Sequence, residues 1–477
     1  MRRNTKIKNS SFIVLLFTII LSSCSKDLAL NPSDTFGENN AFLTIDDIQS
    51  GTNGAYGELG AYLNDMYVNA VISDEARLGI DNAGQGALTY RLQYSSDGVT
   101  GGDVVAAWGA YYSVIDQVNR VLQKVPVVSA APGQEPRRNI LKAQLLAIRA
   151  YSYFELLEAY CKRYSASDNW GVPVVLEPDI LRQPARNTVA EVTSRIEEDF
   201  DSAYALLPVV TSSSFYDTVF NRINIDAIRA RYSLYKGDWD NAIKYSTNVI
   251  SSNVKPLADS ADFLGIWTDE NSDETLLRVR YANSTSVGGM WTTTNGLIYI
   301  APSDKLVGSY DTSDVRLNAY IGTDESKGAH YVNKFYTSSR GGRMVDAKLA
   351  RISEMYLIRA EANAKKSSPD ISAAAADLNL LRSKRISGYH EGAFSSTATV
   401  LNAIYDERFK ELCFEGFRFF DLKRNSLELD RNASDANSTW QTLPVSNYRW
   451  VLPIPQDEML ANPNMVQNDG YNNTNSN

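Results

Sequence analysis

Pairs of amphipathic helical segments joined by tight turns constrain the fold of this chain more than any other feature. Residues 225–252 place alanine, leucine and aromatic side chains at three- and four-residue steps on both sides of Gly237-Asp238, a dipeptide typical of turns. This spacing predicts two closely packed helices. Because one such pair cannot bury its apolar face alone, further pairs must stack on it. We therefore expect a mostly α-helical protein.

A second helical pair is predicted over residues 351–385. Its first helix, which contains Ile352, Met355 and Ala362, has almost no polar face and should be buried, and its partner spans residues 373–385. Both pairs resemble tetratricopeptide hairpins, in which small alanine side chains allow close approach and aromatic rings fill the gaps. The expected fold is a stack of tetratricopeptide-like helix pairs.

Helical periodicity also predicts a helix beginning at Asp46 and helices over about 108–124, 139–160 and 189–207. Residues 256–347 differ, because they are rich in Gly, Ser, Thr and Asn and contain only short apolar pieces. Irregular sequence of this length is unusual inside a compact domain and often carries function. We expect a loop-rich insertion there, with short strands and the ligand-binding site.

The N-terminal residues predict export and lipid anchoring. Basic residues precede a short apolar run, 12–21, which is too short to span a bilayer and is followed by two serines and Cys24. This order resembles a bacterial lipoprotein signal. We expect residues 1–23 to be removed, Cys24 to be lipidated and residues 24–35 to form a tether. No other run is apolar and long enough to span a membrane, so the body should be soluble and tethered.

The remaining domain boundaries follow from these patterns. We expect a helical region over 36–255, the irregular ligand-binding region over 256–347, a second helical region over 348–470 and a disordered polar tail over 471–477.

Composition excludes several classes of protein. A net charge of −9 is unfavourable for binding nucleic acid. Two histidines, His330 and His390, and three cysteines argue against a metal centre, and we expect no cofactor. Cys161 and Cys413 lie in apolar, helix-like sequence, which favours two separate thiols, at least one of them buried, over a disulfide.

Several segments resemble the SusD/RagB family of outer-membrane nutrient-binding lipoproteins. The two most specific to that family are residues 406–424 and the run Leu452-Pro453-Ile454-Pro455. Weaker similarities cover residues 149–156 with 171–175, and 354–362 with 377–382.

The resemblance implies a tetratricopeptide-like, non-enzymatic protein that is lipid-anchored to the outer membrane and faces the cell exterior. Such proteins capture oligosaccharides and deliver them to a SusC-like TonB-dependent transporter. In RagB-like branches of the family the ligand is a peptide. An adaptor with no small-ligand site is a further alternative for this chain.

Acidic residues in the family-like segment call for a choice between catalysis and structure. Glu407, Glu411 and Glu415 lie one helical turn apart and are interleaved with arginine. A glycoside hydrolase needs two carboxyl groups facing each other across a sugar, which a single helix face does not supply. We interpret these residues as a structural ion-pair network, and we expect no catalytic residues.

Aromatic and polar residues in loop-like sequence are the candidates for ligand binding, because a sugar stacks its apolar face on a flat ring while polar groups bind its hydroxyls. Trp291, beside two glycines, is the strongest candidate of the irregular region, followed by Tyr299 and Trp267. A second group lies in the Gly-rich stretch 73–102: Arg77, Asp81, Asn82, Tyr90 and Tyr94.

Overall fold

The computed structural model describes residues 41–99, 101–162, 164, 167–179, 181–281 and 287–471. The predicted signal over 1–23, the lipidated Cys24 and the tether over 24–35 lie outside these residues, as does 472–477. Tyr471, the first residue of the predicted disordered tail, is instead buried, and its hydroxyl donates to the carbonyl oxygen of Val451 at 3.0 Å.

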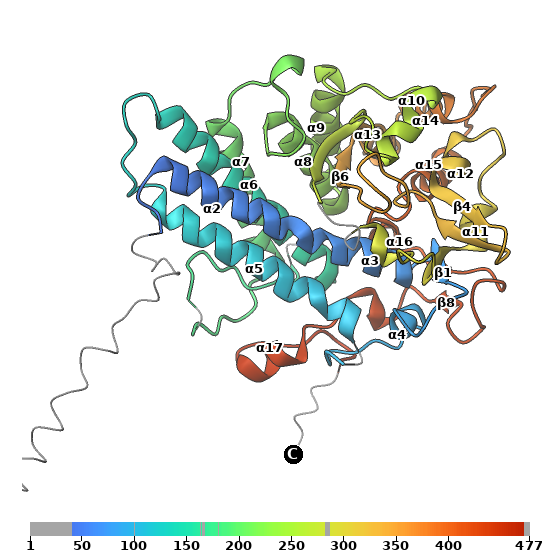
Figure 1. Ribbon diagram of the computed structural model, residues 1–477, viewed down its shortest axis with the longest axis horizontal. Helices are drawn as coiled ribbons and strands as arrows, with labels where there is room; N and C mark the ends of the chain where they lie inside the picture. Colours follow the sequence, from blue (N-terminus) through green and yellow to red (C-terminus); the bar gives the residue numbers. More distant parts are fainter. Residues whose placement is uncertain are drawn as a thin grey trace, which may run out of the picture.

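Long helices form the first half of the molecule and lie side by side (Figure 1). They are α2 (Ile45–Glu58), α3 (Tyr62–Ile72), α5 (Gly102–Lys124), α6 (Glu135–Tyr160) and α7 (Val189–Leu206). Packing runs from α2 to α5, from α5 to α6 and from α6 to α7. The predicted helices are confirmed, although α5 and α6 begin earlier than periodicity indicated; a proline in the first turn of α6 suits a helix start.

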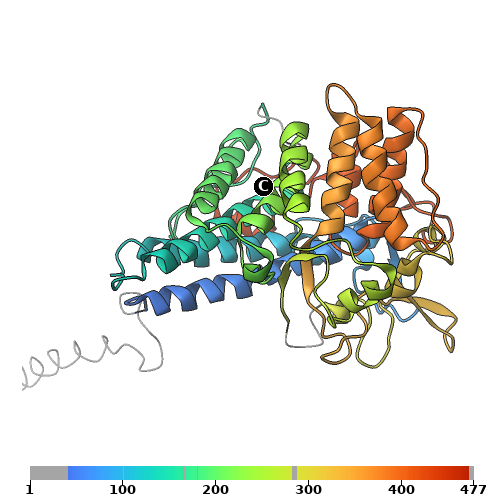
Figure 2. The same cartoon turned by 90° about the horizontal axis from the view of Figure 1, so that it is seen from above.

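The two predicted hairpins are present as α8 (Arg222–Lys236) with α9 (Trp239–Ser252), and α13 (Ile352–Lys365) with α14 (Ile371–Arg385). Helix α9 packs on α13, which also contacts α14 and α15 (Thr397–Glu411), so the pairs stack as expected (Figure 2).

The turn between α8 and α9 shows how local sequence sets this geometry. Gly237 ends α8 at a φ of +79°, a left-handed conformation that favours glycine. Asp238 follows as the N-cap of α9, and its side chain accepts a hydrogen bond from the backbone N–H of Asn241 at 3.2 Å.

Short antiparallel strand pairs join segments distant in sequence. Strand β1 (Ala76–Leu78) pairs with β3 (Ile300–Pro302), and β2 (Thr275–Val279) pairs with β6 (Ala347–Arg351). The irregular region also contains α10 (Ser260–Trp267) before β2, and α11 (Asp304–Val307), α12 (Val315–Tyr320), β4 (Ile321–Asp324) and β5 (Ala329–Val332) between β3 and β6. The irregular region therefore carries short strands, as predicted, but also short helices.

The chain after α15 adds further short elements: α16 (Arg418–Arg424), β7 (Leu429–Asp430), β8 (Thr442–Leu443) and α17 (Gln456–Ala461). Short helix α4 (Ala87–Tyr90) lies in the first half. Within the described residues, no helix combines the length and apolar character needed to cross a bilayer.

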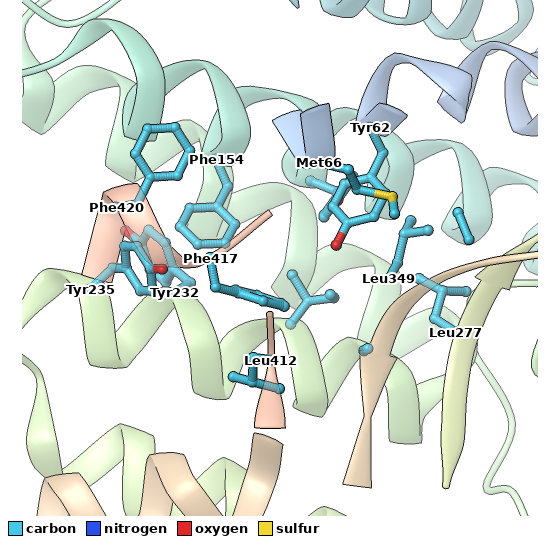
Figure 3. Packing of buried hydrophobic residues seen from close by; sticks show 14 of the residues in the cluster. Tyr62, Met66, Phe154, Tyr232, Tyr235, Leu277, Leu349, Leu412, Phe417 and Phe420 are labelled. Atoms are coloured by element: carbon cyan, nitrogen blue, oxygen red, sulfur yellow. The ribbon is translucent and has the colours of Figure 1, made fainter. Parts of the chain in front are cut away.

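One hydrophobic core joins the helical layers to the irregular region (Figure 3). Tyr62 and Met66 of α3 lie near Leu277 and Leu349 of the β2–β6 pair. On the other side of the view, the ring of Phe154 on α6 contacts Tyr232 and Tyr235 on α8 edge to face, at centroid distances of 5.6 and 5.9 Å. The loop-rich region is thus mounted on the helical stack.

Glu407, Glu411 and Glu415 are buried and paired with cations, but they do not share one helix face as expected, because α15 ends at Glu411 and Glu415 lies in the turn that follows. Nitrogen–oxygen distances are 2.6 Å for Arg316–Glu407, 3.0 Å for Arg351–Glu411, 3.0 Å for Arg385–Glu411 and 2.7 Å for Arg351–Glu415. These pairs tie α12, α14, α15 and β6 together, which confirms the structural interpretation. Cys161 and Cys413 are both buried thiols, also as predicted.

Candidate ligand-binding surface

Pairing of β1 with β3 brings together the two segments that the sequence singled out. Arg77 lies opposite Ala301 in the register. The pairing extends beyond β1, because the backbone N–H of Gly79 donates to the carbonyl oxygen of Tyr299 at 2.8 Å and that of Asp81 to Ile298 at 3.1 Å. Four of the predicted residues, Arg77, Asp81, Asn82 and Tyr299, therefore lie on one pair of adjoining segments.

Close approach of the two backbones requires glycine at position 79. A Cβ atom placed there would lie 2.1 Å from the carbonyl oxygen of Ile298. No side chain fits at that distance without displacing the partner strand. Gly79 thus fixes how closely the 77–82 segment approaches Tyr299.

Polar side chains fasten the loops on either side. The Asp81 carboxylate accepts hydrogen bonds from the backbone N–H of Ile298 at 2.9 Å and from Lys327 Nζ at 2.7 Å. The bond from Lys327 is the main cause that lowers the pKa of Asp81. Asn82 donates its amide to the carbonyl oxygen of Tyr299 at 2.9 Å. Lys327, from the turn between β4 and β5, had no signal in the sequence.

These residues leave polar and apolar groups accessible side by side. Arg77 pairs with Asp304 at 3.3 Å, and the two side chains keep 28% and 37% of their area exposed. Ile80 and Leu297 are exposed, and Tyr299 is half-buried. We use the term ligand surface for this candidate site, which consists of Arg77, Ile80, Asp81, Asn82, Leu297, Tyr299 and Lys327.

Trp291 and Trp267 do not belong to this surface, which corrects their assignment as exposed stacking platforms. Only 0% and 1% of their areas are exposed. Trp291 stacks on Phe335 at 6.2 Å and meets Phe414 edge to face at 5.4 Å. Lack of a helix or strand pattern around Trp291 reflects irregular backbone folded into the core. Its carbonyl oxygen accepts the backbone N–H of Tyr299 at 3.0 Å, so Trp291 supports the surface from below.

Tyr90 and Tyr94 are also buried and offer no ring face to a ligand. Their hydroxyls donate to the carbonyl oxygens of Asp435 and Arg449, each at 2.6 Å. Burial raises the pKa of Tyr90 to about 12. Both tyrosines fasten the C-terminal segments to the first half of the chain.

The ligand surface offers hydrogen-bond donors, acceptors, an aromatic ring and aliphatic side chains. It suits binding of a neutral, polyhydroxylated ligand, in which hydroxyl groups alternate with apolar C–H faces. Within the residues that the structure describes, no group of three or more His, Cys, Asp or Glu side chains is placed to hold a metal ion.

Comparison with known proteins agrees with this architecture. The SusD family model matches residues 267–471, and a SusD-like model described as starch-binding and associating with the outer membrane matches residues 38–234. Together these two matches cover well over half of the chain. SusD-like protein P2 of Formosa agariphila is 24% identical, with 97% of this chain and 99% of that protein aligned.

Solved structures give the same result. A putative sugar binding protein from Bacteroides vulgatus superposes with a TM-score of 0.79 at 26% identity, covering 91% of this chain and all of that one. A SusD superfamily protein from Bacteroides thetaiotaomicron gives 0.78 at 26% identity, covering 89% of this chain and 99% of that one. With both halves matched by family models and the whole fold shared, the chain belongs to the SusD family.

Proposed function

We propose that this protein binds oligosaccharides at the ligand surface, without cleaving them, and delivers them to a SusC-like TonB-dependent transporter in the outer membrane. The observation that carries the proposal is the presence of Arg77, Asp81, Asn82 and Tyr299 on two adjoining segments. Family members named for sugar or starch binding support the choice of ligand.

Affinity at such a surface comes from stacking and hydrogen bonds. The half-buried ring of Tyr299 offers a flat apolar area, while the Arg77 guanidinium and the Asn82 amide supply polar contacts to hydroxyls. Lys327 and Asp304 contact Asp81 and Arg77 before a ligand binds, which reduces the conformational freedom that these exposed side chains lose on binding. Anchoring through Cys24 would keep the protein beside its transporter.

Calorimetric titration with a panel of hexasaccharides tests the ligand: α-1,4-glucan, β-1,4-glucan, xylan and mannan, with unstructured peptides as the comparison. The purified protein should bind at least one glycan. Tyr299→Ala should weaken that binding by about tenfold, the expected cost of one stacked ring. Tyr216→Ala, at an exposed tyrosine outside the ligand surface, is the matched control and should bind like the original protein.

Two outcomes would contradict the proposal. Binding of peptides but of no glycan would move the protein to the RagB-like alternative. Unchanged glycan affinity in Tyr299→Ala and in Arg77→Ala would remove the ligand surface from the binding site. Co-purification of the tagged protein with a TonB-dependent transporter from its native outer membrane tests the partner.

A further inference from the structure

A separate cavity of about 1150 Å³ lies away from the ligand surface and shares no residue with it. It is bounded by the C-terminal end of α6, residues 167–170, the end of α16 and residues 445–451. Ligand pockets typically enclose about 300–1,000 Å³, so this cavity has room for a ligand of several linked rings.

Arg186 holds the walls of this cavity in fixed positions. Its guanidinium donates to the carbonyl oxygen of Trp170 at 2.8 Å, to that of Tyr160 at 3.1 Å and to the side-chain oxygen of Asn468 at 2.8 Å. It also lies 5.6 Å from the centre of the Trp170 ring. One half-buried cation thus joins the end of α6, the 167–170 segment and the C-terminal segment, so the cavity is preorganised.

Aromatic side chains supply an accessible stacking area in the cavity. Trp170 keeps 38% of its area exposed although Arg186 covers part of its ring. Tyr448 is partly exposed and is held edge to face by Tyr471 at 4.9 Å. Exposed rings held by neighbours in this way are typical of sites that stack on a ligand.

Buried polar atoms at the cavity lack partners in the protein. Glu158 Oε1 and the Tyr164 hydroxyl are buried and make no hydrogen bond to any described residue. Burial raises the pKa of Glu158 well above its ordinary value, which favours the neutral carboxyl group, a form that can both donate and accept hydrogen bonds. Unsatisfied groups of this kind are costly unless a ligand or water completes them.

The two cations at the end of α16, Lys423 and Arg424, are held by other groups of the protein. Lys423 Nζ donates to the carbonyl oxygens of Glu158 and Cys161, both at 2.6 Å, and Arg424 pairs with Glu361 at 2.6 Å. An anion site would present cations that point freely toward the ligand, and a lipid site would be almost entirely apolar. Ser446 and Asn447 instead add small neutral polar groups to the lining.

We propose that this cavity is a second carbohydrate site, in which Trp170 stacks on a sugar ring and Glu158, Tyr164 and Asn447 bind hydroxyl groups. This second site goes beyond the proposed function, because binding at the ligand surface does not require the cavity. Two sites on one chain raise the effective concentration of a long glycan at each site.

Fluorine NMR of protein labelled with 5-fluorotryptophan gives a local readout at each of the seven tryptophans. Trp170→Phe assigns the Trp170 signal. At least one hexasaccharide of the panel, added at millimolar concentration, should shift that signal. The same shift should occur in the double variant Arg77→Ala/Tyr299→Ala, in which the ligand surface is altered. Trp170→Ala should weaken binding at the cavity by about tenfold.

Trp440→Ala is the matched control, because Trp440 also carries an arginine, Arg91, over its ring at 5.4 Å but does not line the cavity. The proposed cavity site is contradicted, and the ligand surface is not, by the following outcome. No glycan shifts the Trp170 signal, but calorimetry shows glycan binding, and the ligand-surface variant abolishes it. If a glycan shifts the Trp170 signal and the ligand-surface variants bind glycan normally, the proposed ligand surface is contradicted and the cavity site is supported. If no glycan shifts the Trp170 signal and calorimetry detects no glycan binding, both the ligand surface and the cavity site are contradicted.

Discussion

Ion pairs build both the core around α15 and the ligand surface, but they do so in opposite environments. Arg351 is 1% exposed and engages Glu411 and Glu415, which are themselves buried. Arg77 and Asp304 at the ligand surface keep roughly a third of their side-chain areas exposed. The same pair of chemical groups therefore fixes the scaffold in one place and stays partly exposed to solvent in the other.

Burial decides which of these two uses a charge can have. A buried carboxylate has no water to replace a lost partner, so its arginines cannot move without a large penalty. Exposed pairs exchange partners with solvent at little cost, so a ligand hydroxyl can join or displace them. Substitutions that break one pair in each region test this contrast directly.

Arg351→Met should give the largest effect. It leaves Glu411 and Glu415 each short of a cation in a water-free site, and we expect the free energy of unfolding to fall by about 3–5 kcal/mol. Urea denaturation followed by circular dichroism measures it. Arg77→Met is the matched control and should cost at most about 1 kcal/mol. Equal losses in the two variants would refute the contrast.

Glu75 should make stability depend on pH. Burial raises its pKa to about 8, so the folded state keeps a proton that the unfolded chain releases near its ordinary value. The folded state then binds more protons between those two values, and the free energy of unfolding falls as pH rises through that window. Glu75→Gln keeps a neutral acceptor for the backbone N–H of Phe414 and removes this titration.

Urea denaturation at pH 5 and pH 8 checks this prediction. We compare the free energy of unfolding of Glu75→Gln with that of the original protein at each pH. The difference in favour of the variant should be larger at pH 8 than at pH 5 by more than about 1 kcal/mol. A parallel pH dependence in the two proteins would show that Glu75 does not carry the effect.

Local sequence accounts for the helices, because amphipathic spacing and caps lie within a few residues of one another. The α8–α9 and α13–α14 pairs were predicted for this reason, and so was the α15 ion-pair network. Lys327 could not be predicted, because its bond to Asp81 exists only where the β4–β5 turn meets a segment far away in the chain.

Burial of loop residues is the other property that local sequence does not show. Trp291 and Trp267 lie in or beside irregular sequence, yet rings from distant segments enclose them. Trp170 is the converse case: nothing in its neighbourhood indicated a site, because the cavity needs Arg186 and two C-terminal segments to form. Pattern alone singled out two segments that the β1–β3 pairing brings together, but not which of their aromatic residues are exposed.

Gly79→Ala should separate ligand binding from stability. The added Cβ forces the 77–82 segment away from Ile298, so we expect glycan binding to be lost while unfolding becomes easier by only about 1–3 kcal/mol. Calorimetry and thermal denaturation measure the two effects. Gly98→Ala is the control, because a Cβ there meets no atom within 4 Å. Normal glycan binding by Gly79→Ala would show that the β1–β3 contact does not position the site.

Asp81→Asn should have the smallest effect on stability, and it tests the exposed ion pairs of the ligand surface. Asparagine can still accept the backbone N–H of Ile298, but it loses the charge that pairs with Lys327 at 2.7 Å. We expect a small loss of unfolding free energy at low ionic strength, because exposed ion pairs contribute little to stability. Because exposed charges are screened by salt, this difference should shrink toward zero at about 1 M salt, where the Debye length is about 3 Å. A loss that persists at high salt would place Asp81 in the same energetic class as Glu411, and the distinction between the two regions would fail.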